Sequence, residues 1–214
     1  MKKSLLFIGI IAILIIGGIL IYQNLAKKGE ISMPEKNLAG KKIVIILTFR
    51  DFRDEEYFVP KEILEGAGAE IKTASNQMGT AIGADGADVE VNLLISEINI
   101  IDFDAVIFIG GPGCLENLDN EESYQVAKET VSQNKVLASI CISPVILAKA
   151  GVLEGKKAAV WSSPLDRGPV KILENNGAIY QDKPVVVDGK IITGNGPAAA
   201  REFGGKIIEL LTKK

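Results

Sequence analysis

One cysteine lies where a buried strand should give way to a helix. Residues 136–140 form a short apolar run, which is typical of a strand covered on both faces. A second apolar segment follows Cys141, with Pro144 suited to a first helical turn and Gly151 to a C-terminal cap. The pattern predicts that Cys141 lies on a strand-to-helix elbow, where a helix N-terminus favours the thiolate over the thiol. The alternative is an inert core cysteine, since free cysteine is among the most buried residue types.

A glycine-rich turn follows another predicted buried strand, residues 104–109. The turn reads Gly110-Gly111-Pro112-Gly113, and the backbone N–H groups of such a turn can crowd toward one point to form an anion or oxyanion site. The alternative is an ordinary tight turn. The turn is not the G-x-G-x-x-G fingerprint, so it does not indicate a dinucleotide.

Histidine is absent from all 214 residues. Its absence excludes Ser-His-Asp and Cys-His catalysis within the chain, and zinc sites that need imidazole. The two cysteines, Cys114 and Cys141, cannot supply a disulfide framework. A formal net charge of −3 gives no reason to expect nucleic-acid binding. We expect no metal, no cofactor and no nucleic acid.

The N-terminal segment is apolar and uncharged from Leu5 to Tyr22. At helical rise this run reaches about 27 Å, close to the thickness of a bilayer's hydrocarbon core. We expect a retained single-pass membrane anchor over residues 1–26, a polar tether over 27–40 and a globular domain over 41–214. A cleavable signal peptide is the alternative. The flanking lysines nearly balance, and the short N-terminal flank favours an extracytoplasmic domain.

Predicted strands and helices alternate along the rest of the chain. This order indicates a three-layer α/β domain with a mostly parallel sheet, whose ligands gather beyond the carboxyl ends of the strands. The loops that hold Glu55-Glu56, the glycine-rich turn and Cys141 should all lie at that edge. The expected strands are 43–47, 71–75, 104–109, 136–140, 157–161 and 178–180, with hairpins over 79–100 and around Asp188-Gly189, and the main expected helices are 55–67, 124–134, 165–176 and 198–211.

Four motifs resemble the ThiJ/PfpI superfamily over about residues 41–212. They are Asp54-Glu-Glu-Tyr-Phe-Val-Pro60, Ile109-Gly-Gly-Pro-Gly113, Ala138-Ser-Ile-Cys-Ile-Ser-Pro144 and Thr193-Gly-Asn-Gly-Pro197. The resemblance implies a flavodoxin-like, doubly wound fold related to class I glutamine amidotransferases, and a homodimer. It also implies that Cys141 is the reactive cysteine and that Glu56, four residues before a proline, is its partner. The backbone of Gly110, Gly111 and Ile142 would form an oxyanion-type pocket.

The chain departs from this superfamily at the catalytic partner. Peptidase-like members follow the elbow cysteine with histidine and glycine, whereas this chain has Ile142 and Ser143. Deglycase-like members carry a histidine before a proline in the next loop, where this chain has Ser163 before Pro164. Peptidase activity is therefore poorly supported.

Two hypotheses follow from the remaining pair. In the first, the Cys141 thiolate attacks reactive carbonyls or glycated small molecules, assisted by Glu56. In the second, Cys141 is oxidised in a redox-responsive or binding protein without turnover. We expect a lowered pKa for Cys141 and a raised pKa for Glu56, kept protonated by burial and by the thiolate. The alternative for Glu56 is a solvated first-turn carboxylate.

The second cysteine, Cys114, lies one residue beyond the glycine-rich turn. Loops that leave neighbouring parallel strands can bring two Cα atoms within disulfide range. Cys114 could therefore act as a resolving thiol for an oxidised Cys141. The alternative is a small apolar residue packed under the loop.

Overall fold

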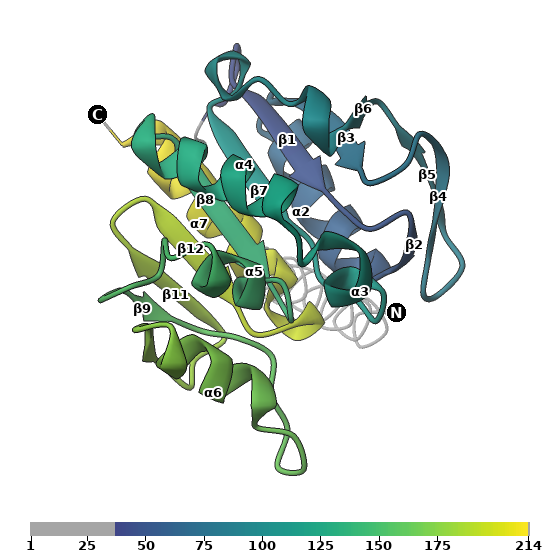
Figure 1. Ribbon diagram of the computed structural model, residues 1–214. Coiled ribbons are helices and arrows are strands. Elements are labelled where there is room, and N and C mark those ends of the chain that lie inside the picture. The colour runs from purple at the N-terminus through teal and green to yellow at the C-terminus, as the bar shows by residue number, and fades with distance from the viewer. Residues whose placement is uncertain (1–36, 214) are drawn as a thin grey trace, which may run out of the picture. The chain divides into compact units, whose positions relative to one another are not determined.

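The computed structural model describes residues 37–213, and a seven-stranded sheet forms the centre of the domain (Figure 1). The strand order is β11-β12-β8-β7-β1-β3-β6, and every neighbouring pair is parallel except β11 with β12. The predicted mostly parallel α/β fold is therefore confirmed. The strands are β1 (Lys42–Ile46), β3 (Glu70–Ser75), β6 (Leu93–Leu94), β7 (Ala105–Phe108), β8 (Val136–Ile140), β11 (Val185–Asp188) and β12 (Ile191–Gly194).

Helices cover both faces of this sheet, which explains why its central strands are buried and mostly apolar. α2 (Asp54–Gly66) and α7 (Ala200–Thr212) pack together on one face, while α4 (Glu121–Ser132) and α5 (Pro144–Lys149) lie on the other (Figure 1). α6 (Gly168–Asn175) packs beside α5. All residues of β7 and β8 are buried. Burying one large aliphatic side chain stabilises the fold by roughly 1.5–3 kcal/mol.

Two smaller sheets flank the main one. β2 (Arg50–Phe52), β4 (Gly79–Gly83) and β5 (Asp88–Val91) form a three-stranded sheet, in which β4 and β5 are the predicted antiparallel hairpin. β9 (Lys157–Ala158) and β10 (Ile179–Tyr180) pair separately. The expected strand over 157–161 is wrong beyond Ala158, since the Ala159 N–H donates to the Thr193 side chain at 2.8 Å. The sequence patterns did not predict β2 or the short helix α3 (Cys114–Leu118).

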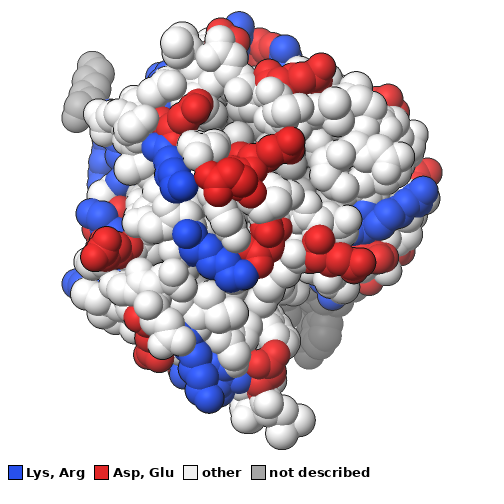
Figure 2. Space-filling view, in the orientation of Figure 1, with Lys and Arg blue, Asp and Glu red and all other residues white. Residues whose placement is uncertain are grey.

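The predicted membrane anchor lies outside the described residues. Among residues 37–213, no helix is both long enough and apolar enough to cross a membrane. On the face drawn in Figure 2, acidic and basic side chains are interspersed rather than gathered by sign. This face has no clustered basic patch of the kind that nucleic-acid binding uses.

The parallel order of β1, β7 and β8 determines where the site forms. These three strands are adjacent, so the segments that leave their carboxyl ends emerge at one edge of the sheet. β1 leads to β2 and α2, β7 leads to the glycine-rich turn, and β8 leads to Cys141.

Candidate functional site

Cys141 occupies a strained elbow between β8 and α5. Its φ angle is +65°, in the left-handed region that L-residues adopt at a penalty of about 1–2 kcal/mol. The Cys141 N–H donates to the Gly194 carbonyl at 2.9 Å, and the Trp161 N–H donates to the Cys141 carbonyl at 2.7 Å. These two bonds anchor the backbone on both sides of the side chain. The predicted strand-to-helix elbow is confirmed, and Cys141 lies between the end of β8 and the start of α5.

Ser143 supports the elbow from below. Its buried Oγ accepts the Ile140 N–H at 3.1 Å, lies 2.8 Å from Ser139 Oγ, and lies within hydrogen-bond distance of the Phe108 carbonyl at 2.9 Å. The hydroxyl therefore joins the ends of β7 and β8. It is occupied by these structural contacts and is unsuited to act as a base.

Glu56 reaches the elbow from the first turn of α2. Its side chain is fully buried, and its Oε2 accepts the Gly110 N–H at 3.2 Å. A Cβ added to Gly110 would lie 2.6 Å from Cys141 Cβ and 2.9 Å from Glu56 Oε2. The two side chains therefore converge over Gly110, where only glycine fits. A solvated carboxylate, the alternative for Glu56, is inconsistent with this burial.

The glycine-rich turn also lies very close to β2, the strand before α2. Gly111 has a φ of +125°, and a Cβ there would lie 2.4 Å from the Asp51 carbonyl oxygen. Its N–H and that of Ile142 lie beside the Cys141 sulfur. The Gly110 N–H is instead bonded to Glu56. Of the three backbone groups expected to form the oxyanion-type pocket, those of Gly111 and Ile142 therefore lie near the sulfur, and that of Gly110 does not.

Burial controls the protonation of the Cys141–Glu56 pair. Burial raises the pKa of Glu56 from its ordinary value of 4.5 to about 7, against the lowering effect of the Cys141 thiol, the Gly110 N–H and the Arg53 charge. Burial also raises the pKa of Cys141, and the neighbouring Glu56 carboxylate raises it further, whereas the N–H groups of Ile142 and Gly111 lower it. The pair therefore retains a proton near neutral pH.

The expected lowering of the Cys141 pKa is wrong. α5 has only six residues and begins at Pro144, so the cysteine lies before the first turn of a very short dipole. Two backbone N–H groups do not offset desolvation and a carboxylate. The expected increase in the pKa of Glu56 agrees with the structure.

A cavity of about 320 Å³ opens above Cys141. Arg53 and Trp161 both line it, although the sequence patterns did not single them out as site residues. Arg53 directly precedes α2, and its N–H donates to the Gly110 carbonyl at 3.0 Å. The remaining lining residues are Gly111, Pro112, Leu115, Cys141 and Ile142.

Cys114 lies in the core at the start of α3. Its side chain is fully buried, burial raises its pKa well above the ordinary value, and both cysteines are free thiols. The structure contains no disulfide between them. A resolving role for Cys114 stays a prediction, and its burial favours the packing alternative.

Comparisons with known proteins identify the family of this chain. An uncharacterized protein from Methanocaldococcus jannaschii is 37% identical, over 83% of this chain and 86% of its own length. A deglycase from Pyrococcus horikoshii is 33% identical, over 78% of this chain and 98% of its own. A solved ThiJ/PfpI domain protein from Brachyspira murdochii is 34% identical with a TM-score of 0.76, covering 80% of this chain and 98% of that one. Residues 41–210 match the DJ-1/PfpI family, and the chain belongs to it.

Proposed function

We propose that this protein adds the Cys141 sulfur to reactive carbonyl groups of small molecules, with Glu56 moving the proton. The supporting observation is the convergence of the two side chains over Gly110, beneath a cavity of about 320 Å³. The deglycase relatives in the family support a substrate of this kind.

The geometry suits a proton-coupled addition. A pKa of about 7 leaves Glu56 partly ionised near neutral pH, so it can accept the thiol proton as sulfur attacks the carbonyl carbon. The C–S bond forms, the C=O π pair moves to oxygen, and that oxygen takes the proton from Glu56. The product is a hemithioacetal, and no oxidant is needed. The N–H groups of Gly111 and Ile142 are suited to stabilise the developing oxyanion.

Methylglyoxal consumption tests this proposal. Cys141→Ala should abolish it, and Glu56→Gln should slow it by about 10²–10⁴-fold because the amide cannot relay a proton. Glu55→Gln is the matched control, since Glu55 is the exposed neighbour in the same helical turn. Wild-type consumption no faster than that of Cys141→Ala would contradict the proposal.

Oxidation of Cys141 without turnover is the second candidate. The cavity gives access to the sulfur, whose residue is 9% exposed, and the protonated Glu56 could donate to an oxidised sulfur. Peroxide titration followed by intact mass separates the two functions. Stoichiometric oxygen addition at Cys141, in a protein that consumes no methylglyoxal, would favour this candidate.

The membrane anchor and the homodimer are further parts of the proposal. The uncharged run from Leu5 to Tyr22 supports the anchor, and family membership supports the dimer. Membrane fractions should retain the full chain until detergent is added. Light scattering in that detergent should give twice the protomer mass, and a single protomer mass would contradict the dimer.

A further inference from the structure

The cavity above Cys141 has a single charged side chain in its wall, Arg53. Trp161, Leu115 and Ile142 provide apolar surface, and Cys141 provides the nucleophile. Sites for small molecules combine mostly apolar walls with a few placed polar groups that fix orientation. The cation of Arg53 is therefore the feature that would select among carbonyl compounds.

The Arg53 side chain has donors to offer a ligand. Its Nη1 contacts Asp85 Oδ2 at 3.3 Å and Oδ1 at 3.5 Å, both long for a charged hydrogen bond. The Asp85 side chain is 63% exposed, and an ion pair this exposed stabilises little. Within residues 37–213, Nε and Nη2 have no hydrogen-bond acceptor. Arginine presents five N–H donors in a planar fork that matches a carboxylate.

The backbone of Arg53 is fixed beside the Cys141–Glu56 pair, and its side chain lines the cavity above that pair. The Arg53 N–H is bonded to the Gly110 carbonyl, directly next to the Gly110 N–H that Glu56 accepts. On the other side, the Asp54 carboxylate accepts the N–H groups of Asp85 and Ala87, each at 2.9 Å. Arg53 and Asp85 are thus both positioned by the start of α2. The Arg53 charge also reaches Glu56 electrostatically.

We propose that Arg53 selects aldehydes that carry a carboxylate, with glyoxylate the smallest example. The carboxylate would pair with the Nε and Nη2 donors while the aldehyde carbon faces the Cys141 sulfur. This inference rests on the proposed carbonyl chemistry of Cys141. The covalent step is the same addition: the S–H bond breaks, the C–S bond forms, and the proton passes through Glu56 to the former carbonyl oxygen. The carboxylate is unchanged.

Charge explains why a cation is needed for such a substrate. The Cys141–Glu56 pair carries up to one negative charge near neutral pH, which opposes the approach of an anion. Arg53 offsets that repulsion from within the same cavity wall. Methylglyoxal has a similar size and an aldehyde but no charge, so it needs no such partner.

The test uses the only tryptophan in the chain, Trp161, as a reporter of cavity occupancy. In a Cys141→Ala background, which cannot form the C–S bond, glyoxylate should change the Trp161 fluorescence in a saturable way. Arg53→Gln should weaken this binding by roughly 10–100-fold, the effect of losing a charged hydrogen-bonding partner. In the Cys141-containing protein, removing the Arg53 charge also acts on Glu56 and so affects both substrates. Arg53→Gln should therefore slow glyoxylate consumption by roughly 10–100-fold more than it slows methylglyoxal consumption.

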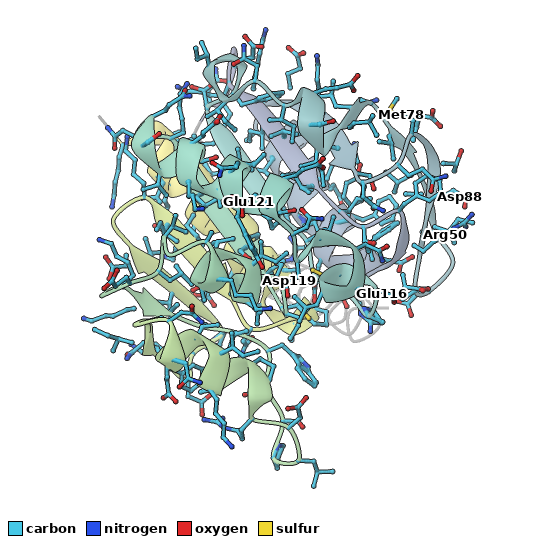
Figure 3. The ribbon with its side chains drawn as sticks, viewed as in Figure 1. Arg50, Met78, Asp88, Glu116, Asp119 and Glu121 are labelled. Carbon is cyan, nitrogen blue, oxygen red and sulfur yellow. The ribbon has the colours of Figure 1, made fainter. Side chains whose placement is uncertain are left out.

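Arg50→Gln is the matched control. Arg50 lies on β2 and its guanidinium stacks over the Phe49 ring at 5.1 Å, outside the cavity lining. Figure 3 shows Arg50 on the three-stranded sheet, where it pairs with Ile82 of β4. Asp85→Asn is a second variant, because removing the competing carboxylate should tighten glyoxylate binding a few-fold even if Arg53→Gln fails to fold.

Unchanged glyoxylate affinity in both Arg53→Gln and Asp85→Asn would overturn the inference. Equal loss of glyoxylate and methylglyoxal consumption in Arg53→Gln would also overturn it, as would absence of glyoxylate binding to Cys141→Ala. A wild-type protein that consumes neither carbonyl contradicts the proposed function instead. The fluorescence titration still decides the role of Arg53 in that case.

Discussion

Replacing Glu56 with glutamine should make the protein more stable at alkaline pH. Glu56 is fully buried, and burial raises its pKa to about 7. The folded state therefore holds a proton between pH 4.5 and about 7 that the unfolded chain has released. Where the folded state binds more protons, stability falls as pH rises. The contribution of Glu56 is thus fully present below pH 4.5 and is lost as pH rises through about 7.

The size of the effect follows from the two pKa values. From 4.5 to about 7, at about 1.36 kcal/mol for each pH unit, the loss comes to about 3 kcal/mol. Glutamine is neutral at every pH and nearly isosteric, and its carbonyl oxygen can still accept the Gly110 N–H. Glu56→Gln should therefore match wild type near pH 4.5 and exceed its stability by about 3 kcal/mol at pH 8. For a domain of this size the melting temperature should differ by roughly 6–12 °C.

Thermal and urea unfolding at pH 4.5, 6 and 8 measure this difference. Glu55→Gln is the control, and its difference from wild type should be within about 0.5 kcal/mol at every pH because Glu55 is exposed. A stability difference between Glu56→Gln and wild type that stays constant from pH 4.5 to 8 would refute the raised pKa, and with it the role of Glu56 as a base.

Three further predictions concern the elbow. Gly110→Ala should destabilise the protein by about 1–3 kcal/mol and remove carbonyl addition, whereas Gly205→Ala, with open space at its Cβ position, should be neutral or stabilising in urea unfolding. Because Cys141 has a φ of +65°, Cys141→Gly should be about 1 kcal/mol more stable than Cys141→Ala, and the reverse order would contradict the strained backbone. After mild peroxide, intact mass should show oxygen adducts; a loss of two hydrogens that disappears in Cys114→Ser would instead establish the resolving thiol.

The elements around the site could be predicted where local pattern and tertiary environment agree. The apolar run at 136–140 lies between β7 and β12 and forms β8 with the expected bounds. Pro144 marks the first turn of α5 as its missing N–H predicts. The hairpin around Asp188 forms too, although Gly189 and Lys190 are its loop residues, since Asp188 pairs with Ile191.

The strand predicted from the sequence is wrong where long-range contacts replace strand pairing. Residues 159–161 have the composition of a strand, yet the Trp161 N–H bonds to the Cys141 carbonyl and the Ala159 N–H bonds to a threonine side chain. These bonds direct Trp161 to the cavity. No periodicity in the sequence encodes them, because their partners lie on distant segments. The only local indication that this segment could line a site is that Trp161 is the single tryptophan of the chain.

The chain has no histidine, but another side chain can perform the general-base catalysis for which histidine is commonly used. General-base catalysis near neutral pH needs a group that titrates there, whatever its side chain. Glu56 meets that condition because α2 buries it against Gly110, which has no side chain to separate it from Cys141. The same burial raises the pKa of Cys141, so in the proposed reaction the sulfur would need Glu56 to remove its proton. Loss of the Glu56 carboxylate should therefore impair this site as severely as loss of histidine impairs a Cys-His pair.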